Sequence, residues 1–338
     1  MIKKICFFSA GFAFNRFNWL KYYEEIFPRD VQIYLFTTNR FKGKENENYQ
    51  YEWDLNRTKI ITANFDWTLP LKLRRFCKDE KIERIVNLGN RSALVMFLFA
   101  TLFLPTAYFL SMMGWVTRER DTIKKPYLSN LKDFFSVRSW WFFYIFGLFA
   151  KKIISVDFGI YKRFTSFQRS FLSKIFIDKN KIIYLPFPVN TDLFEPKNKN
   201  ISRKKLKLGL NKNIVIFVGR ISHGKCSDIL ISAIKSNPDV IFIVIGRAME
   251  GELFKLKSKN IIYIEKKSSK ELVDYYNAAD LGLFMHRDLG GGLGQTTAES
   301  IACGLPTITV IREGIEKSPA LYQIPVDAEE ANKIIKSF

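Results

Sequence analysis

The 338-residue sequence has few of the residues from which metal sites and covalent catalytic sites are built. It holds four cysteines, scattered without C-x-x-C spacing, and two histidines, His223 and His286. The cysteine spacing indicates neither a zinc site nor a disulfide framework and fits a reducing compartment such as the cytosol. No D-x-D triplet occurs, so a frequent carboxylate signature for a divalent ion is missing. We therefore predict no metal ion and no cofactor.

Acidic residues are also scarce, with 33 Asp and Glu against 53 Lys and Arg, a formal net charge of +20. Residues 1–188 hold 31 of the cations against 16 of the acids, and they also hold all six tryptophans. Basic residues interleaved with aromatic rings favour adsorption to an anionic membrane surface. They could also bind single-stranded nucleic acid, but no recognisable nucleic-acid module accompanies them. We expect the membrane surface as partner and keep nucleic acid as the alternative.

Two long apolar runs raise the question of a membrane span. Residues 92–115 are nearly uncharged, but Pro105 divides them, and we predict a buried helix over 92–104 and a parallel strand over 106–110. A transmembrane span is the alternative. Residues 139–150 are too short to span a bilayer and are flanked by cations, so they form either a core helix or an interfacial anchor. We expect this second run to contact the bilayer.

The order of the remaining patterns predicts an α/β protein of two domains. The first half opens with a strand over 2–9, which fits a folded start better than a cleavable signal, then a helix over 15–27 and a strand over 31–37. A basic amphipathic helix follows at 68–81, a strand at 152–157, and a linker over 186–205. In the second half we predict strands at 213–218, 240–245, 261–264, 281–285 and 306–310, with helices at 226–235, 250–258, 269–278 and 295–303.

The most informative stretch is residues 279–309, where a buried strand leads through glycines at 290–292 and 294 into a helix that carries Glu299. Glycines let a ligand approach the backbone, and the first turn of a helix favours an anion such as a phosphate. Glu299 lies deeper, where a carboxylate could accept hydrogen bonds from a sugar diol. The alternative interpretation is an ordinary tight turn with a solvated glutamate.

A pair of cations strengthens the first interpretation. Arg220 and Lys225 follow the strand at 213–218 and precede a helix. Each alone is more often a surface charge, but two cations at the carboxyl end of a strand can converge on one diphosphate.

With these motifs the sequence resembles a known family, the retaining, nucleotide-sugar-dependent glycosyltransferases of family 4, also described as glycosyl transferases group 1. The matching segments come in the family's order at 181–196, 217–225, 240–247, 261–286 and 291–308. The resemblance implies a GT-B fold, in which two Rossmann-like doubly wound parallel-sheet domains face a cleft. It further implies an acceptor-binding domain over 1–188 and a donor-binding domain over 189–338.

Carried over by position, Arg220 and Lys225 resemble the catalytic pair that binds the donor diphosphate, and Glu299 resembles the carboxylate that holds the ribose. The resemblance adds a set of further donor-binding positions: Gly11, Gly219, Ile264, Lys266, Gly292, Leu293, Gly294, Gln295 and Thr296. Gly294, Gln295 and Thr296 resemble the helix start at the phosphates, and Ile264 and Lys266 the loop at the base.

The sequence departs from the family's pattern at two places. A glutamate that contacts the donor sugar usually stands eight residues before the ribose glutamate, and here that position is Gly291, so Asp288 is a candidate replacement. A histidine near the reacting sugar is frequent in the first domain, where this chain has none and offers Ser111 and Met112 instead.

These features predict a metal-independent hexosyltransferase. It would move a sugar from a nucleoside-diphosphate sugar, a UDP-sugar ahead of a GDP-sugar, to a lipid-linked or cell-surface glycan precursor at the cytoplasmic face of the membrane. One alternative is a sugar-nucleotide epimerase on the same fold, for which we see no cluster of carboxylates and histidines to transfer protons. The other is a basic nucleic-acid-binding protein without catalysis, which leaves the motifs of the second half unexplained.

Overall fold

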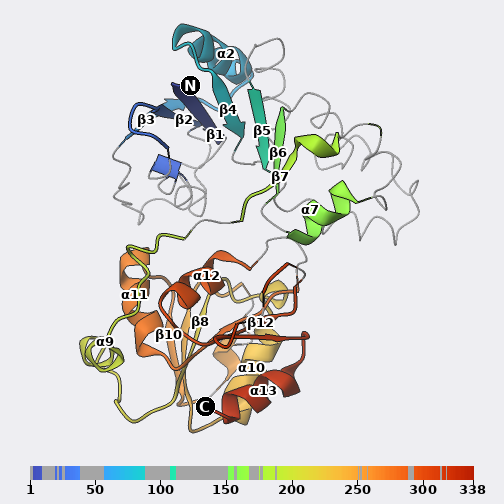
Figure 1. The fold of residues 1–338 in the computed structure, drawn as a ribbon. Helices are drawn as coiled ribbons and strands as arrows, with labels where there is room; N and C mark the ends of the chain where they lie inside the picture. Colours follow the sequence, from blue (N-terminus) through green and yellow to red (C-terminus); the bar gives the residue numbers. More distant parts are fainter. Residues whose placement is uncertain are drawn as a thin grey trace. The chain divides into compact units, whose positions relative to one another are not determined.

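The computed structural model divides the chain into two compact units, Met1–Pro188 and Val189–Phe338 (Figure 1). The residues that it describes are 3–9, 20, 23–24, 27–38, 57–87, 107–111, 151–155, 158–166, 175, 178–186, 189–249, 251, 253–256, 258–287, 293–312, 314–316 and 318–338.

The first unit is built on a seven-stranded sheet in the order β3-β2-β1-β4-β5-β6-β7, and every pairing is parallel. Its strands are β1 Lys4–Ser9, β2 Gln32–Thr38, β3 Thr58–Ala63, β4 Arg84–Asn87, β5 Ala107–Ser111, β6 Lys152–Ser155 and β7 Ile182–Tyr184. Its described helices are α2 Leu69–Asp79, α7 Phe158–Thr165 and the short η1 Lys179–Lys181. The buried strands are apolar because a parallel sheet is covered on both faces.

The predicted strands at 2–9, 31–37, 106–110 and 152–157 are confirmed, with ends shifted by one to two residues. β5 pairs with β4 and β6 inside the sheet, so this part of the run at 92–115 is not a membrane span. The predicted helix at 92–104 and the run at 139–150 lie outside the described residues. Within the described ranges, no helix combines the length and the hydropathy that crossing a bilayer requires.

The second unit carries a six-stranded parallel sheet in the order β10-β9-β8-β11-β12-β13. Its strands are β8 Ile214–Val218, β9 Ile241–Ile245, β10 Ile261–Ile264, β11 Leu281–Phe284, β12 Thr307–Val310 and β13 Leu321–Ile324. Its helices are α9 Lys199–Lys205, α10 Ser227–Ser236, α11 Ser269–Ala278, α12 Gln295–Ala302 and α13 Ala328–Lys336, with short η2 His223–Lys225 and η3 Leu253–Lys255.

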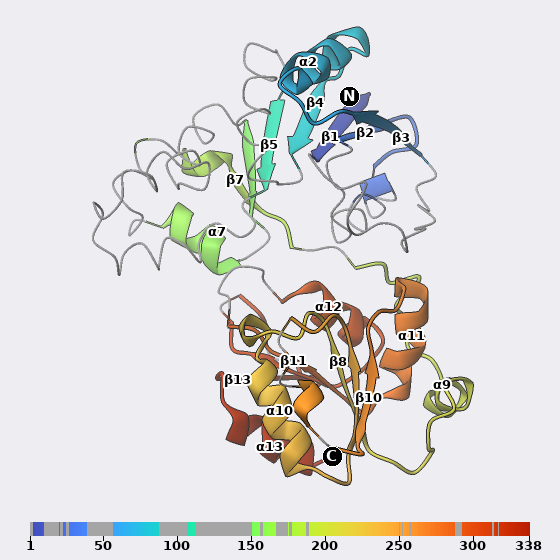
Figure 2. The ribbon, with the colours of Figure 1, turned by 180° about the vertical axis from the view of Figure 1, so that it is seen from behind.

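Alternate residues of β8 enter two different cores. Val215 and Phe217 pack with α10 and α13 on one face of the sheet, whereas Ile214 and Ile216 pack with α11 on the other (Figures 1 and 2). Both faces of the strand are therefore buried, which explains why its sequence is a continuous apolar run.

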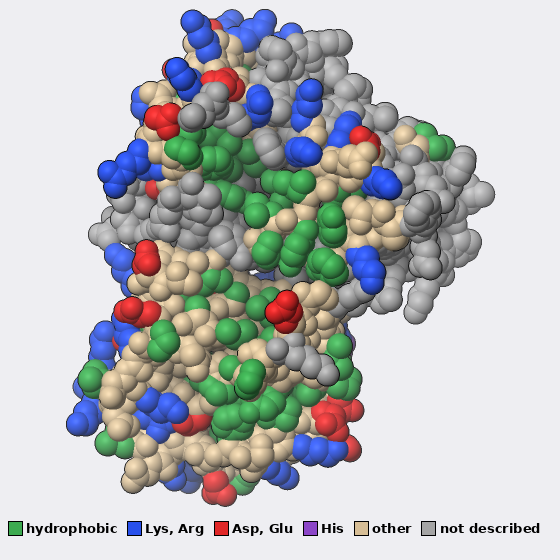
Figure 3. Space-filling model, in the orientation of Figure 1, with side chains coloured by type: hydrophobic (Ala, Val, Ile, Leu, Met, Phe, Trp, Pro, Cys, Tyr) green, Lys and Arg blue, Asp and Glu red, His purple; other side chains and the backbone are tan. Residues whose placement is uncertain are grey.

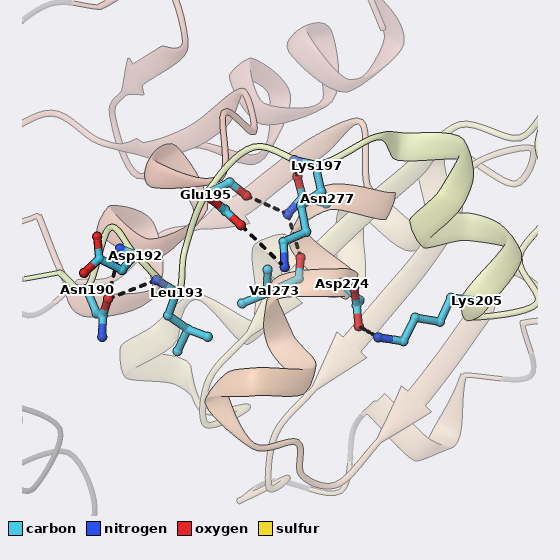
Figure 4. Close-up of polar contacts among 9 residues, drawn as sticks. All are labelled: Asn190, Asp192, Leu193, Glu195, Lys197, Lys205, Val273, Asp274 and Asn277. Atoms are coloured by element: carbon cyan, nitrogen blue, oxygen red, sulfur yellow. Dashed lines mark hydrogen bonds and ion pairs between the residues drawn. The ribbon is translucent and has the colours of Figure 1, made fainter. Parts of the chain in front are cut away.

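The structure corrects two predictions in this unit. Among the described residues of the predicted helix at 250–258, the three-residue turn η3 is the only helical part, and the predicted linker to residue 205 ends in helix α9. The segment before α9 is fixed to α11 through Asn277, whose side-chain amide donates to the carbonyl oxygens of Glu195 and Val273 at 3.1 and 2.9 Å (Figure 4). The Asn277 side-chain oxygen accepts from the Lys197 N–H, so this stretch belongs to the second domain.

The strand order reverses between β8 and β11. From β8 the chain proceeds to β9 and β10 on one side, and then returns to place β11, β12 and β13 on the other. In doubly wound sheets, ligands bind outside the carboxyl ends of the strands at such a topological switch point. The loops that follow β8 and β11 are therefore where a ligand is expected.

Candidate functional site

The loop after β8 presents two cations at the carboxyl edge of the sheet. Gly219 has φ +146°, which turns the chain out of the strand, and the side chain of Arg220 is exposed. Lys225 ends the turn η2, where its N–H donates to the Ser222 carbonyl at 2.8 Å. Cys226 then adopts a left-handed conformation with φ +55° immediately before α10. Arg220 and Lys225 thus both lie in the segment that connects β8 to α10.

A second glycine explains how closely the strand ends approach each other. Gly246 follows β9, also with φ +146°, and a Cβ atom there would lie 1.9 Å from the carbonyl oxygen of Gly219. Any side chain at Gly246 would therefore push the two strand ends apart. Glycine is required at this point beside Arg220.

Arg287 joins the segment that follows β8 to the segment that follows β11 at the switch point. Its backbone N–H donates to the Gly224 carbonyl at 2.9 Å, and its Nη1 donates to the His223 carbonyl at 2.7 Å. Its two Nη atoms also bind the two carboxylate oxygens of Asp228, each at 2.7 Å. These bonds hold the pKa of the Asp228 carboxyl below its usual value.

The start of α12 lies beside the end of β11. The N-cap residue is Gly294, with φ +83°, so it has no side chain with which to cap the helix, and the first turn carries no acidic residue. A Cβ atom on Gly294 would lie 3.8 Å from Nε2 of His286, and 3.9 Å from Oγ1 of the fully buried Thr297. The positive end of the helix dipole is therefore placed at the switch point, where it favours an anion.

His286 is oriented from behind by Arg312. The Nη2 atom of Arg312 lies 2.5 Å from His286 Nδ1. Because an arginine N–H can only donate, Nδ1 must accept, and the neutral imidazole then carries its proton on Nε2, the atom next to Gly294.

Glu299 is buried inside the domain, with 3% of its surface exposed. Gln295 Nε2 donates to its Oε1 at 2.9 Å, and the Tyr276 hydroxyl donates to its Oε2 at 3.3 Å. Burial raises the pKa of Glu299 to about 7, although both hydrogen bonds act in the opposite direction. The carboxyl group is thus fixed by α11 and α12, and its charge is sensitive to pH near neutrality.

The predicted site residues fall into two groups within the second unit. The first group surrounds the switch point and consists of Gly219, Arg220, Lys225, Leu293, Gly294, Gln295, Thr296 and Glu299. The second group, Ile264 and Lys266, lies at the end of β10, two strands away from β8; the Ile264 carbonyl accepts from the Gly246 N–H at 2.9 Å. Gly11, Asp288, Gly291 and Gly292 lie outside the described residues.

Sequence reasoning missed the residues that support this site, namely Asp228, Tyr276, His286, Arg287 and Thr297. One signal was available, because His286 and Arg287 are polar residues directly after a buried strand that ends at the switch point. The partners of Arg287 lie 59 and 64 residues away in sequence and could not be read from it. Within the ranges that the structure describes, no three His, Cys, Asp or Glu side chains form a potential metal site.

Most of the second unit is similar to a family of known proteins. Residues 198–323 match the family model described as glycosyl transferases group 1. The D-inositol 3-phosphate glycosyltransferase of Mycolicibacterium smegmatis is 29% identical over 149 residues, which are 41% of this chain and 34% of that protein. The chain thus spans about a third of the length of the curated relatives it matches. These matches support a glycosyltransferase.

Solved structures resemble the chain over its whole length. HepE of Anabaena, in complex with UDP and glucose, has a TM-score of 0.69 at 16% identity, covering 100% of this chain and 89% of HepE. Sucrose-phosphate synthase of Thermosynechococcus elongatus has a TM-score of 0.71 at 13% identity, covering 99% and 89%. With the two parallel sheets, these likenesses identify the fold as GT-B, made of two Rossmann-like domains.

Proposed function

We propose that the protein transfers a sugar from a nucleoside-diphosphate sugar to an acceptor, with retention of the anomeric configuration. The observation that carries this proposal is the meeting of two anion-binding elements at one switch point. The loop with Arg220 and Lys225 and the start of α12 are brought together by consecutive residues, since Arg287 contacts the loop and His286 lies beside Gly294. Such an arrangement suits a diphosphate.

In this proposal Arg220, Lys225 and the amides at Gly294, Gln295 and Thr296 stabilise the negative charge that develops on the leaving diphosphate. Glu299 receives the ribose hydroxyls, and Ile264 and Lys266 lie toward the base. No side chain is proposed as nucleophile and no metal ion as cofactor. Removing one preorganised group of this kind costs about 3 kcal/mol of transition-state stabilisation, roughly a hundredfold or more in rate.

A UDP-sugar is the preferred donor in the proposal, and the support comes from similar proteins. HepE has been solved with UDP and glucose and, separately, with UDP-glucose. A thermal-shift screen of UDP-, GDP- and ADP-sugars tests this preference, because a ligand that binds only the folded state raises the melting temperature.

Transfer itself is tested by the release of UDP from a UDP-sugar in the presence of lipid-linked acceptors. Arg220→Ala and Lys225→Ala should each lower turnover at least about a hundredfold while remaining folded. Lys235→Ala, at the far end of α10, is the matched control and should retain full activity. Near wild-type turnover in either site variant would refute the assignment, and unchanged turnover in EDTA is expected if no metal takes part.

We further propose that the acceptor is lipid-linked and that the first unit adsorbs to an anionic bilayer at the cytoplasmic face of the membrane. Trp67, just before α2, is 92% exposed, and Leu71, one turn on, is 69% exposed. The exposed cations Lys72, Arg75 and Lys78 lie on the same helix, where Lys and Arg side chains gather on the surface (Figure 3). Exposed aromatic and cationic side chains together favour the headgroup region.

A further inference from the structure

Arg287, three residues after the end of β11, is tied by its side chain to the segment that follows β8. Its four hydrogen bonds reach two adjoining elements, the turn η2 and the first turn of α10. Two of the acceptors are the carbonyl oxygens of His223 and Gly224, the residues directly before Lys225. Arg287 therefore sets the position of the backbone that carries Lys225.

This backbone needs support because it is locally unfavourable. Cys226, directly after Lys225, has φ +55°, a conformation that side chains with a Cβ atom rarely adopt. Such a residue persists only where its surroundings hold it in place. Asp228, two residues further on, is hydrogen-bonded to Arg287, as are His223 and Gly224 before Cys226. Arg287 therefore binds the chain on both sides of the strained residue.

The positive charge of Arg287 is already paired with the carboxylate of Asp228. Asp228 accepts from both Nη atoms at 2.7 Å, in the bidentate geometry that is strongest for a guanidinium and a carboxylate. The side chains of Arg287 and Asp228 are 28% and 48% exposed, and an ion pair so exposed contributes little to stability. Removing it should leave the domain folded.

We propose that Arg287 is a positioning residue for the diphosphate site. It holds the Lys225 segment against the end of β11, so that Lys225 and the start of α12 act on the same diphosphate. The inference rests on the proposed function, because it requires a diphosphate at the switch point. The rival role is that Arg287 leaves Asp228 and binds the phosphate directly.

The two roles predict opposite effects of Asp228→Asn. If Arg287 is a positioning residue, Asp228→Asn weakens the ion pair with Arg287, the Lys225 segment becomes less ordered, and diphosphate affinity falls. For a direct phosphate ligand, the loss of the competing carboxylate frees Arg287 and tightens binding.

The experiment measures dissociation constants for UDP by calorimetry and for uridine by saturation-transfer NMR. The variants are Arg287→Ala, Arg287→Lys and Asp228→Asn, with Lys235→Ala as the matched surface control. We expect Arg287→Ala and Asp228→Asn to weaken UDP binding about tenfold, the scale of one lost charged hydrogen bond. Arg287→Lys should also weaken it, since lysine cannot form the fork. Uridine affinity should stay within about twofold in all of them, because uridine carries no phosphate for Lys225 to bind.

A loss of affinity for UDP without a loss of affinity for uridine distinguishes a positioning role from a merely structural one. Structural damage would lower the affinity for both ligands. Free guanidinium ion should restore part of the UDP affinity of Arg287→Ala. Tighter UDP binding by Asp228→Asn, or unchanged binding by Arg287→Ala while Arg220→Ala loses it, would overturn the inference and leave the proposed function intact. Absence of binding of any nucleoside diphosphate by the wild-type protein would overturn both.

Discussion

The hydroxyl of Tyr276 donates to Oε2 of Glu299 at 3.3 Å, which joins α11 to α12 in the interior of the second domain. Both residues are almost fully buried, and the donors to this carboxyl group among the described residues are two neutral groups, the Tyr276 hydroxyl and the Gln295 amide. This relationship makes the stability of the domain depend on pH in an unusual direction.

Glu299→Gln should remove that dependence. The folded-state pKa of about 7 lies above the value of 4.5 for the unfolded chain. Between pH 4.5 and pH 7 the folded protein therefore holds a proton on Glu299 that the unfolded chain has lost, and the folded state loses stability as the pH rises through this range. Between pH 5 and pH 8, the free energy of unfolding of the wild-type protein should fall by about 2–3 kcal/mol relative to Glu299→Gln. Urea unfolding at a series of pH values measures this.

Glu271→Gln is the matched control for that experiment. Hydrogen bonds from Lys267 and Ser268 lower the pKa of Glu271 to about 2, so its stabilising effect is present above 4.5 and is lost only in acid. The difference between this variant and the wild type should be nearly constant from pH 5 to pH 8. A constant difference for Glu299→Gln as well would contradict the burial of its charge.

Gly246→Ala should destabilise the second domain strongly. The new Cβ would lie 1.9 Å from the Gly219 carbonyl, and φ +146° is unfavourable for alanine. Overpacking and backbone strain each cost about 1–3 kcal/mol, so a loss of about 3 kcal/mol or more is expected in urea unfolding. Gly251→Ala has open space around the added Cβ and should change stability little. Equal stability of the two variants would show that the strand ends can separate freely.

Asp280→Ala should loosen the attachment of α9. Arg203 is 4% exposed, and its Nη2 donates to Asp280 Oδ2 at 2.6 Å, an atom that also accepts from the Ile214 N–H at 2.8 Å. Removal of the carboxylate leaves a buried cation uncompensated, at a cost of about 3 kcal/mol. Lys199→Ala removes only the half-exposed partner of Asp280 and should cost less than about 1 kcal/mol. Similar losses for both variants would argue against a buried charge at Arg203.

Trp67→Ser combined with Leu71→Ser should weaken binding to anionic vesicles without lowering the melting temperature, because both side chains are exposed. Co-sedimentation with phosphatidylserine vesicles at two salt concentrations measures this, and the binding that remains should weaken further with salt. Ile201→Ser, at a residue of the second unit that is 67% exposed, is the control. If the double substitution leaves vesicle binding unchanged, the membrane contact does not involve Trp67 and Leu71.

Much of the second domain could be predicted from sequence because its central strands are buried on both faces. β10 and α11 were predicted with the ends that the structure gives them. β13 and, in the first unit, β3 were missed, since they lie at sheet edges with partly exposed residues and lack a continuous apolar run. The short strands β4 and β7 of the first unit were also not predicted. α13 was missed because only Ala331 and Ile335 of its residues are buried.

The sequence by itself determined the alternation of strands and helices, the two cations after β8, and the glycine that opens α12, because each depends on neighbouring residues. Only the tertiary structure decided that Arg287 binds Asp228 and that Tyr276 binds Glu299. Hydrogen bonds between residues far apart in the chain depend on the strand order, and no local pattern encodes that order. The reversal between β8 and β11 brings the separate anion-binding elements to one place.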